Sequence, residues 1–264
     1  MGGRKKRRQR EHSAEAVAKR QKQHGKDQKS FTTAEGQVLP VELKKYWRSR
    51  HKLFWRFDEG IQIDEEGWYS VTPEIIAEDT ASRIAQLYND QGNEPDYGRI
   101  CVIDAFCGVG GNTIKFAEWC EHVIAIDIDP QRLEMAKINA AIYGVADRIE
   151  FIVGDFHELA PTLKADVVFM SPPWGGPEYT GADIFDLGSM PFHSAQEWVD
   201  RARLISANIA FFMPRNCDPL QLAGLAPNMP CDIELNYTNG FFKAITAYYG
   251  DLALFGGSNS RLLL

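Results

Sequence analysis

The chain has 264 residues, of which 44% are hydrophobic and 25% charged; these proportions are ordinary for a globular protein and exclude collagen-like, fibrous and wholly disordered chains. No apolar run approaches the roughly 18 residues of a membrane-spanning helix, and the N-terminus is charged, so we expect an intracellular soluble protein. The five cysteines and six histidines show neither Cys-x-x-Cys pairs nor metal-ligand spacing, so we expect no disulfide framework and no metal site.

The charge is divided unevenly along the chain. Residues 1–30 hold eleven Lys/Arg against three Asp/Glu, a net +8, so the remaining 234 residues carry −15. A basic run such as GRKKRRQR at residues 3–10 attracts a polyanion through counterion release and is also typical of nuclear import signals. A solvated charged tail is the alternative interpretation. We expect a nuclear protein, with the nucleolus as one possible site.

Composition and patterning predict four parts. Residues 1–38 are poor in aromatic and β-branched side chains and should form a disordered basic arm. Residues 39–90 should form an accessory helical segment, with one aromatic and basic helix over 41–57 and a second that runs from Pro73 to Tyr88, capped by Thr72. Residues 91–255 should form the main domain and 256–264 a frayed tail.

Short apolar runs alternate with amphipathic stretches from residue 100 onward. We expect strands at 100–104, 123–127, 149–153, 166–170, 209–213, 233–237 and 244–248. Helices are expected at 111–119, from 129 to 141, and after the capping box that begins at Ser194. This alternation predicts an α/β fold, a Rossmann-like doubly wound and mostly parallel seven-stranded sheet with a small N-terminal helical accessory segment.

Ligands of open α/β sheets bind beyond the carboxyl ends of the strands, so the residues at these ends are the main candidates for a binding site. The first strand ends at Asp104 and leads into a glycine loop that contains Gly108 and Gly110. The second strand ends at Asp127, near the spacing at which an acidic residue accepts hydrogen bonds from ribose hydroxyls. A glycine turn with such an acid is typical of nucleoside-cofactor sites, although a tight packing turn alone would also explain the glycines.

The third strand leads into Asp155, which suits the exocyclic amine of an adenine but could equally be a plain helix cap. Asp104, Asp127 and Asp155 thus fall at the ends of three successive strands, and together they indicate an adenosine pocket. The glycine loop lacks the Gly-x-x-x-x-Gly-Lys-Ser/Thr pattern that cradles a triphosphate, so ATP is disfavoured.

The fourth strand ends in Ser171, Pro172, Pro173 and Trp174, the most informative motif of the chain. Two prolines followed by an aromatic residue form a rigid wall. A planar base could stack on Trp174, while the carbonyls of Ser171 and Pro172 accept hydrogen bonds from an exocyclic amine. An aromatic plug in a proline turn is the structural alternative.

Three runs of the sequence resemble class I S-adenosylmethionine-dependent methyltransferases: 102–112 (VIDAFCGVGGN), 123–130 (VIAIDIDP) and 166–177 (DVVFMSPPWGGP). From about residue 45 to residue 251 the chain resembles, more narrowly, the trimethylguanosine synthase family of RNA cap guanine-N2 methyltransferases. Residues 56–60 (RFDEG) and 68–74 (WYSVTPE) carry this narrower resemblance. Ser171 stands where general amino-methyltransferases usually have Asp or Asn.

The resemblance implies a role for individual residues. The cofactor S-adenosyl-L-methionine would be held by Phe54, Thr72, Asp104, Phe106, Gly108, Gly110, Asn112, Asp127 and Asp155. Ser171, Pro172 and Trp174 would form the catalytic wall, with Pro173 beside the base. Lys45, Tyr179 and Arg215 would hold the cap phosphates, although spacing does not separate Lys45 from the neighbouring Lys44, Arg48 and Arg56.

The resemblance also implies an activity, the transfer of two methyl groups to N2 of the 7-methylguanosine cap of small nuclear and nucleolar RNAs, giving 2,2,7-trimethylguanosine. Capped RNA would be the partner, with small ribonucleoprotein core proteins as further candidates, and we expect a monomer. No strong general base is required, and His157 is expected to be a surface residue. The alternatives are an amino-methyltransferase acting on adenine or a protein amide, and a cap-binding scaffold on an inactive methyltransferase fold.

Overall fold

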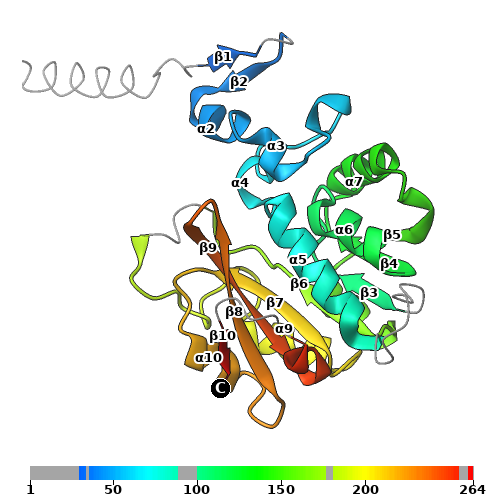
Figure 1. Cartoon of the computed structure of the whole chain (residues 1–264), viewed down its shortest axis with the longest axis vertical. Helices are drawn as coiled ribbons and strands as arrows, with labels where there is room; N and C mark the ends of the chain where they lie inside the picture. The colour runs from blue at the N-terminus through cyan, green and yellow to red at the C-terminus, as the bar shows by residue number, and fades with distance from the viewer. Residues whose placement is uncertain (1–29, 34–35, 89–99, 177–180, 256–260, 264) are drawn as a thin grey trace, which may run out of the picture. The chain divides into compact units, whose positions relative to one another are not determined.

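The computed structural model describes residues 30–33, 36–88, 100–176, 181–255 and 261–263. The chain divides into two compact units, Met1–Arg48 and Ser49–Leu264 (Figure 1). This division falls inside the range 39–90 that the sequence assigned to one accessory segment. Within the described residues, no helix is long and apolar enough to cross a membrane.

The smaller unit contains a two-stranded antiparallel sheet of β1 (Ser30–Thr32) and β2 (Val38–Pro40), followed by η1 (Val41–Leu43) and α2 (Lys44–Trp47). Phe31 lies opposite Leu39, whose side chain is buried. The prediction of disorder for residues 1–38 is therefore wrong for 30–32 and 38, because pairing across a short turn satisfies their backbone groups locally. Residues 1–29 lie outside the described part of the chain.

The single helix predicted for residues 41–57 is also wrong. The structure has α2, then α3 (Arg50–Leu53), and then η2 (Phe57–Glu59). The helix breaks because Phe54 adopts an extended backbone conformation, with φ −141° and ψ 118°, which buries its side chain to 2% exposure. Leu53 and Phe57 are buried as well, so α3 and η2 each contribute an apolar side chain to the core.

The remaining accessory helices are α4 (Gly67–Ser70), α5 (Glu74–Ala85) and η3 (Gln86–Tyr88). The predicted end at Tyr88 is confirmed. Pro73 is the N-cap of α5 rather than its first residue, and Thr72 does not cap the helix. The hydroxyl of Thr72 instead accepts a hydrogen bond from the side-chain amide of Asn112 on α6.

The larger unit is built on a mixed sheet with the strand order β10-β8-β9-β7-β6-β3-β4-β5. Its strands are β3 (Cys101–Asp104), β4 (His122–Asp127), β5 (Ile149–Val153), β6 (Val167–Met170), β7 (Ile209–Pro214), β8 (Cys231–Thr238), β9 (Phe241–Tyr249) and β10 (Arg261–Leu263). The five strands β3 to β7 are parallel, and β8, β9 and β10 pair antiparallel. The seven predicted strands are thus confirmed.

An eighth strand, β10, corrects the prediction of a frayed tail. It pairs antiparallel with β8, with Leu262 opposite Ile233, because β8 is the edge of the predicted sheet and its open backbone groups can accept another strand.

Helices cover both faces of the sheet, as the doubly wound fold predicts. They are α6 (Gly111–Trp119), α7 (Pro130–Tyr143), α8 (Phe156–Leu159), α9 (Ala195–Ala202) and α10 (Pro219–Gly224), with one-turn pieces η4 (Ala146–Arg148), η5 (Ala160–Thr162) and η7 (Gly250–Leu254). In Figure 1, α5, α6 and α7 lie side by side on one face. The opposite face packs on α9 and α10 through a core that includes Met170, Phe211, Trp198 and Leu222. This arrangement leaves the carboxyl ends of the parallel strands free to form a site.

A buried cation joins the accessory helix α5 to the antiparallel strands. Arg83 is 4% exposed; its Nη2 lies 2.6 Å from the carboxylate of Asp232 and donates to the carbonyl of Leu252. Its Nη1 lies 3.1 Å from Glu234, and the guanidinium stacks 3.7 Å from the ring centroid of Tyr248. Because these partners surround the charge, the desolvation cost of Arg83 is offset within the core.

Arg83→Ala should lower the free energy of unfolding by about 3–5 kcal/mol, because it leaves the fully buried Asp232 carboxylate without its cation. Arg203→Ala is the matched control; its ion pair with Asp200 spans 4.0 Å and is exposed, so about 0–1 kcal/mol is expected. Urea denaturation measures both values. Equal losses in the two variants would contradict the role assigned to Arg83.

Candidate functional site

The glycine loop begins at a carboxylate that is completely buried. Asp104 ends β3 and accepts hydrogen bonds from the Thr113 hydroxyl on α6, at 2.6 Å, and from the Phe106 amide, at 3.4 Å. Burial raises the pKa of Asp104 to about 7. Asp104 therefore connects the end of the strand to the following helix and sets the path of the loop between them.

Two glycines of this loop have left-handed backbone conformations, with φ +52° at Gly108 and +93° at Gly110. A Cβ on Gly110 would approach the Cβ of Ala136 on α7 to 3.2 Å, so loop and helix pack at a distance that suits only glycine. A Cβ on Gly108 would meet no atom within 4 Å, so this position borders open space. The loop can thus approach a ligand with its backbone.

Asp127, at the end of β4, binds the backbone of the same loop. Its carboxylate accepts hydrogen bonds from the amides of Gly108, at 2.8 Å, and Asp129, at 2.9 Å. Burial raises its pKa. The next residue, Ile128, is 68% exposed although it directly follows a buried strand. Sequence reasoning missed Ile128, although an apolar residue directly after a strand end was the available signal.

Asp155 follows β5 and caps α8, accepting a hydrogen bond from the His157 amide at 2.8 Å. The helix-cap interpretation is therefore confirmed, while its contact to an adenine stays a prediction. Phe156 is buried, and Phe106 lies 6.1 Å from it between ring centroids. Because β3, β4 and β5 are adjacent and parallel, the three predicted aspartates lie along one edge of the sheet.

The accessory segment contacts the start of α6. Phe54 is buried, and a Cβ on Gly111 would lie 3.9 Å from its Cζ. The Asn112 side-chain amide donates to the Thr72 hydroxyl at 3.0 Å. The Oδ1 of Asn112 is buried and has no hydrogen-bond partner among the described residues. The structure therefore brings Phe54, Thr72 and Asn112 together, with one acceptor atom available to a ligand.

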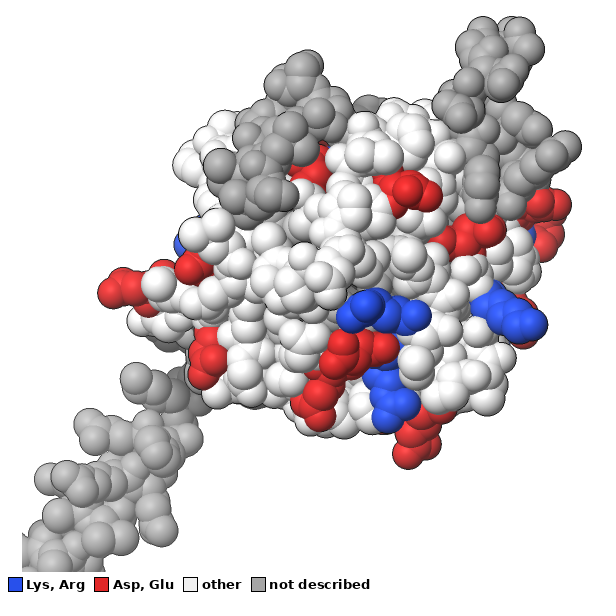
Figure 2. Space-filling model, turned by 90° about the horizontal axis from the view of Figure 1, so that it is seen from below, with Lys and Arg blue, Asp and Glu red and all other residues white. Residues whose placement is uncertain are grey.

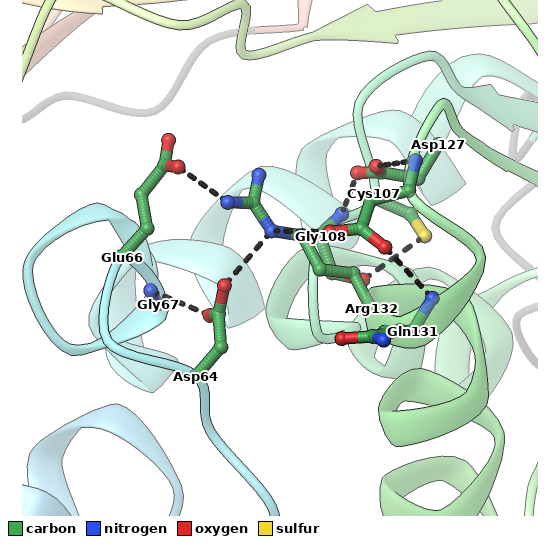
Figure 3. A network of polar contacts seen from close by, with 9 residues as sticks. Asp64, Glu66, Gly67, Cys107, Gly108, Asp127, Gln131 and Arg132 are labelled. Atoms are coloured by element: carbon green, nitrogen blue, oxygen red, sulfur yellow. Dashed lines mark hydrogen bonds and ion pairs between the residues drawn. The ribbon is translucent and has the colours of Figure 1, made fainter.

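Two side chains of α7, which sequence reasoning missed, fix the accessory segment beside this loop; Figure 3 shows one of them, Arg132, with Asp64 and Glu66. The fully buried Asn139 accepts from the Gln62 amide, at 2.8 Å, and donates to the carbonyls of Gln62 and Val109. Arg132 pairs with Asp64, at 2.9 Å, and with Glu66. No local pattern signals these contacts, because the partners are 30 or more residues apart in the sequence.

The proline–tryptophan wall begins where β6 ends. Pro172 is buried, and Ser171, Pro173 and Trp174 are half-buried. The Trp174 ring lies 5.6 Å from that of Phe212 on β7, tilted by 32°, so the neighbouring strand supports one side of the indole. The wall follows β6, which pairs parallel with β3. It therefore lies at the same edge of the sheet as the aspartates.

The predicted phosphate-binding residues fall in three places. Arg215 is exposed and follows β7 at the same edge of the sheet. Lys45 belongs to the smaller unit, where its Nζ lies 4.6 Å from the ring centroid of Tyr46. Tyr179 lies outside the described residues. The structure therefore places Arg215 at this edge, and the phosphate-binding roles of all three residues stay predictions.

Comparison with known proteins agrees with this geometry. The family model of RNA cap guanine-N2 methyltransferases matches residues 99–252. The chain is 41% identical to the trimethylguanosine synthase of Schizosaccharomyces pombe over 219 residues, which cover 80% of this chain and 87% of that protein. It is 35% identical to the trimethylguanosine synthase of Saccharomyces cerevisiae over 222 residues, covering 80% and 68%.

Solved structures show the same fold at low sequence identity. A crystal structure described as a methyltransferase from Porphyromonas gingivalis W83 superposes with a TM-score of 0.60 at 13% identity, over 85% of this chain and 51% of that one. A structure described as an RNA methyltransferase from Pyrococcus horikoshii gives a TM-score of 0.52 at 14% identity, over 76% and 97%. These two likenesses support the Rossmann-like fold.

The raised pKa of Asp104 predicts a pH dependence of stability. Between its ordinary pKa of 3.8 and its native pKa of about 7, the folded protein keeps a proton that the unfolded chain releases. This contribution is complete below pH 4 and is lost as the pH rises to 7. Asp104→Asn should remove it, so wild type should lose up to about 4 kcal/mol relative to the variant across this window. Denaturation at several pH values, with the exposed Asp147→Asn as control, measures the difference; a constant difference would contradict the burial of the charge.

Proposed function

Because the chain belongs to the RNA cap guanine-N2 methyltransferase family, we propose that it transfers two methyl groups from S-adenosyl-L-methionine to N2 of 7-methylguanosine caps, giving 2,2,7-trimethylguanosine. The observation that carries this proposal is the placement of the Trp174 wall on the same sheet edge as the glycine loop and its aspartates. A base and a nucleoside cofactor would meet there.

The residues around the glycine loop fit the cofactor. The open space at Gly108 admits a ligand, and the free Oδ1 of Asn112 accepts from a donor such as the methionine ammonium. Asp127 suits the ribose hydroxyls, and the exposed Ile128 offers an apolar surface for the adenine. Asp155 would accept from the adenine amine. S-adenosylmethionine, when bound, supplies a methyl group on a positively charged sulfur.

Trp174 would hold the methylated guanine. A 7-methylguanine is cationic, and a cation over an indole face gains on the order of 0.5–2 kcal/mol. Phe212 supports the indole from the strand side, so the ring is fixed before the base arrives. This contribution would favour the methylated over the unmethylated cap by about tenfold, and further selectivity would come from other contacts.

The backbone at the wall would orient the reacting amine. Prolines at 172 and 173 have no N–H, so their nitrogens do not compete for the carbonyls of Ser171 and Pro172, which would accept from the N2 hydrogens. Such alignment of amine and methyl can lower a barrier by roughly 7–11 kcal/mol, which removes the need for a strong general base. The nitrogen would lose its proton after transfer.

The cap phosphates would be bound by Arg215, with Tyr179 and Lys45 as further predicted contacts. The substrate would be capped small nuclear and nucleolar RNA, and the basic run at residues 3–10 would direct the protein to the nucleus. Small ribonucleoprotein core proteins are candidate partners. The chain would act as a monomer.

The direct test is transfer of labelled methyl to a 7-methylated cap dinucleotide and to its unmethylated counterpart, with the product nucleosides identified by mass. The proposal predicts one and then two methyl groups on N2 of the methylated cap only. Label on an adenine or on a protein amide would point to a different acceptor. Cofactor binding without transfer to any acceptor would support an inactive scaffold.

Asp127→Ala should weaken binding of S-adenosylmethionine by about tenfold or more, because it removes the ribose acceptor and releases the Gly108 amide. Isothermal titration measures the affinity. Asp147→Ala, an exposed carboxylate on η4, is the matched control and should bind normally. Unchanged affinity in Asp127→Ala would refute the ribose assignment.

Trp174→Ala should abolish cap methylation while leaving the affinity for S-adenosylmethionine nearly unchanged, because the indole is assigned to the base and not to the cofactor. Methyl transfer and titration measure the two quantities separately. Trp119→Ala, at the far end of α6, should retain activity. Simultaneous loss of cofactor binding in Trp174→Ala would show that the wall is structural.

A further inference from the structure

The hairpin of β8 and β9 carries an aromatic tip, residues 237–243, that the proposed mechanism does not use. Its turn consists of Asn239 and Gly240, with φ +52° and +76°, the left-handed pair that closes a tight hairpin. Such a turn fixes the strand register, so the side chains of the tip are held in place.

The tip exposes apolar rings that a core would normally bury. Phe241 is 70% exposed and Tyr237 47%. Tyr237 stacks on Phe242, with 5.2 Å between ring centroids and 29° between planes, and Phe242 packs against the main core. This pair braces the hairpin, whereas the Phe241 ring is left to the solvent.

A basic side chain accompanies the exposed ring. Asn236 lies opposite Ala244 and Tyr237 opposite Phe242, so Lys243 is the extra residue of a β-bulge. Bulges of this kind redirect a side chain at the end of a sheet. Lys243 is exposed, and its Nζ lies 6.0 Å from the Phe241 ring centroid. An exposed aromatic ring with a cation beside it is the combination that binds a base and its phosphate.

The register places this tip beyond the catalytic edge. Phe211 on β7 lies opposite both Met170, where β6 ends, and Ala247 on β9. Phe241 precedes Ala247 by six positions, one of which is the bulge residue Lys243, so the tip extends roughly 17 Å past the level of Met170. A stacked strand rises roughly 3.4 Å per nucleotide, so this reach covers several nucleotides. In Figure 1 the hairpin turn and the segment after β6 lie at the same end of the molecule.

A second cation lies at this end, with the exposed carboxylates of Asp183 and Asp186 on the segment that is hydrogen-bonded beside it. The exposed Arg215 follows β7 there. On the face seen from below in Figure 2, the described Lys and Arg side chains lie directly beside Asp and Glu. A polyanion finds no continuous positive stretch among the described residues of that face.

We propose that the aromatic tip binds the single-stranded RNA that directly follows the cap, with Phe241 stacking on a base and Lys243 contacting a phosphate. This inference rests on the proposed function, since the cap must occupy the Trp174 wall for the following nucleotides to reach the hairpin. The tip would not contact the cap itself, so it distinguishes capped RNA from a free cap.

The test compares a 7-methylated cap dinucleotide with a capped ten-nucleotide RNA as substrates of the full chain. In Phe241→Ala, KM for the capped RNA should rise about fivefold or more, with kcat and all parameters of the dinucleotide unchanged. Lys243→Ala should raise the same KM and reduce the salt dependence of RNA binding by about one unit of the logarithmic slope. Leu204→Ala and Lys164→Ala, exposed residues that precede β7 and β6 at the opposite edge, are matched controls.

Each other outcome has a separate meaning. Equal losses on dinucleotide and RNA would show that the tip supports the cap site and would overturn the inference. Unchanged kinetics of the variants on both substrates would also overturn the inference, because the tip would then not bind the RNA. If wild type methylates neither substrate, the proposed function fails, and the inference fails with it. Thermal denaturation of the variants confirms that they fold.

Discussion

One buried amide determines how the accessory segment meets the methyltransferase sheet. The Asn139 side chain lies fully inside the protein and bonds the backbone of Gln62 through both its donor and its acceptor, while it also holds the carbonyl of Val109 in the glycine loop. A fully buried amide that makes three hydrogen bonds tolerates little displacement, since each broken bond leaves one of its polar atoms unsatisfied inside the protein. The Asn139 side chain therefore fixes the glycine loop and the accessory segment relative to each other.

The two aspartates under the loop extend this constraint. Asp104 connects β3 to α6 through Thr113, and Asp127 holds the Gly108 amide from β4. Both carboxylates have raised pKa values because they are buried. The protein thus places acidic groups where solvation is poor, which destabilises their charged forms and makes them responsive to a ligand that donates hydrogen bonds.

The sheet and its edge could be predicted from sequence because their signals are local. Buried parallel strands are short apolar runs, and the residues that follow them mark the carboxyl edge of the sheet. The sequence therefore sufficed to predict that Asp104, Asp127 and the Trp174 wall lie at this edge. Asn139 and Arg132 could not be found in this way, since their partners lie far along the sequence. The helix over residues 41–57 failed for a related reason, because tertiary burial of Phe54 overrode a local helical pattern. The short strand β10 likewise depends on its partner β8, which no local pattern reveals.

The ion pair between Arg83 and Asp232 has a consequence for the order of folding. Its members are 149 residues apart, so this contact of the helix that carries Arg83 forms only after the C-terminal antiparallel strands, whereas the ion pairs of Glu74 and Glu78 with Lys115 on α6 need only the first part of the chain. Contacts between residues so far apart close a long loop of chain. The conformational entropy lost in closing it makes such contacts form late in folding. During synthesis the ribosome therefore releases Arg83 long before its partners exist. A nascent chain that ends before β8 holds the glycine loop, the wall and the partners of α5 on α6, yet leaves the Arg83 guanidinium without the carboxylates of Asp232 and Glu234.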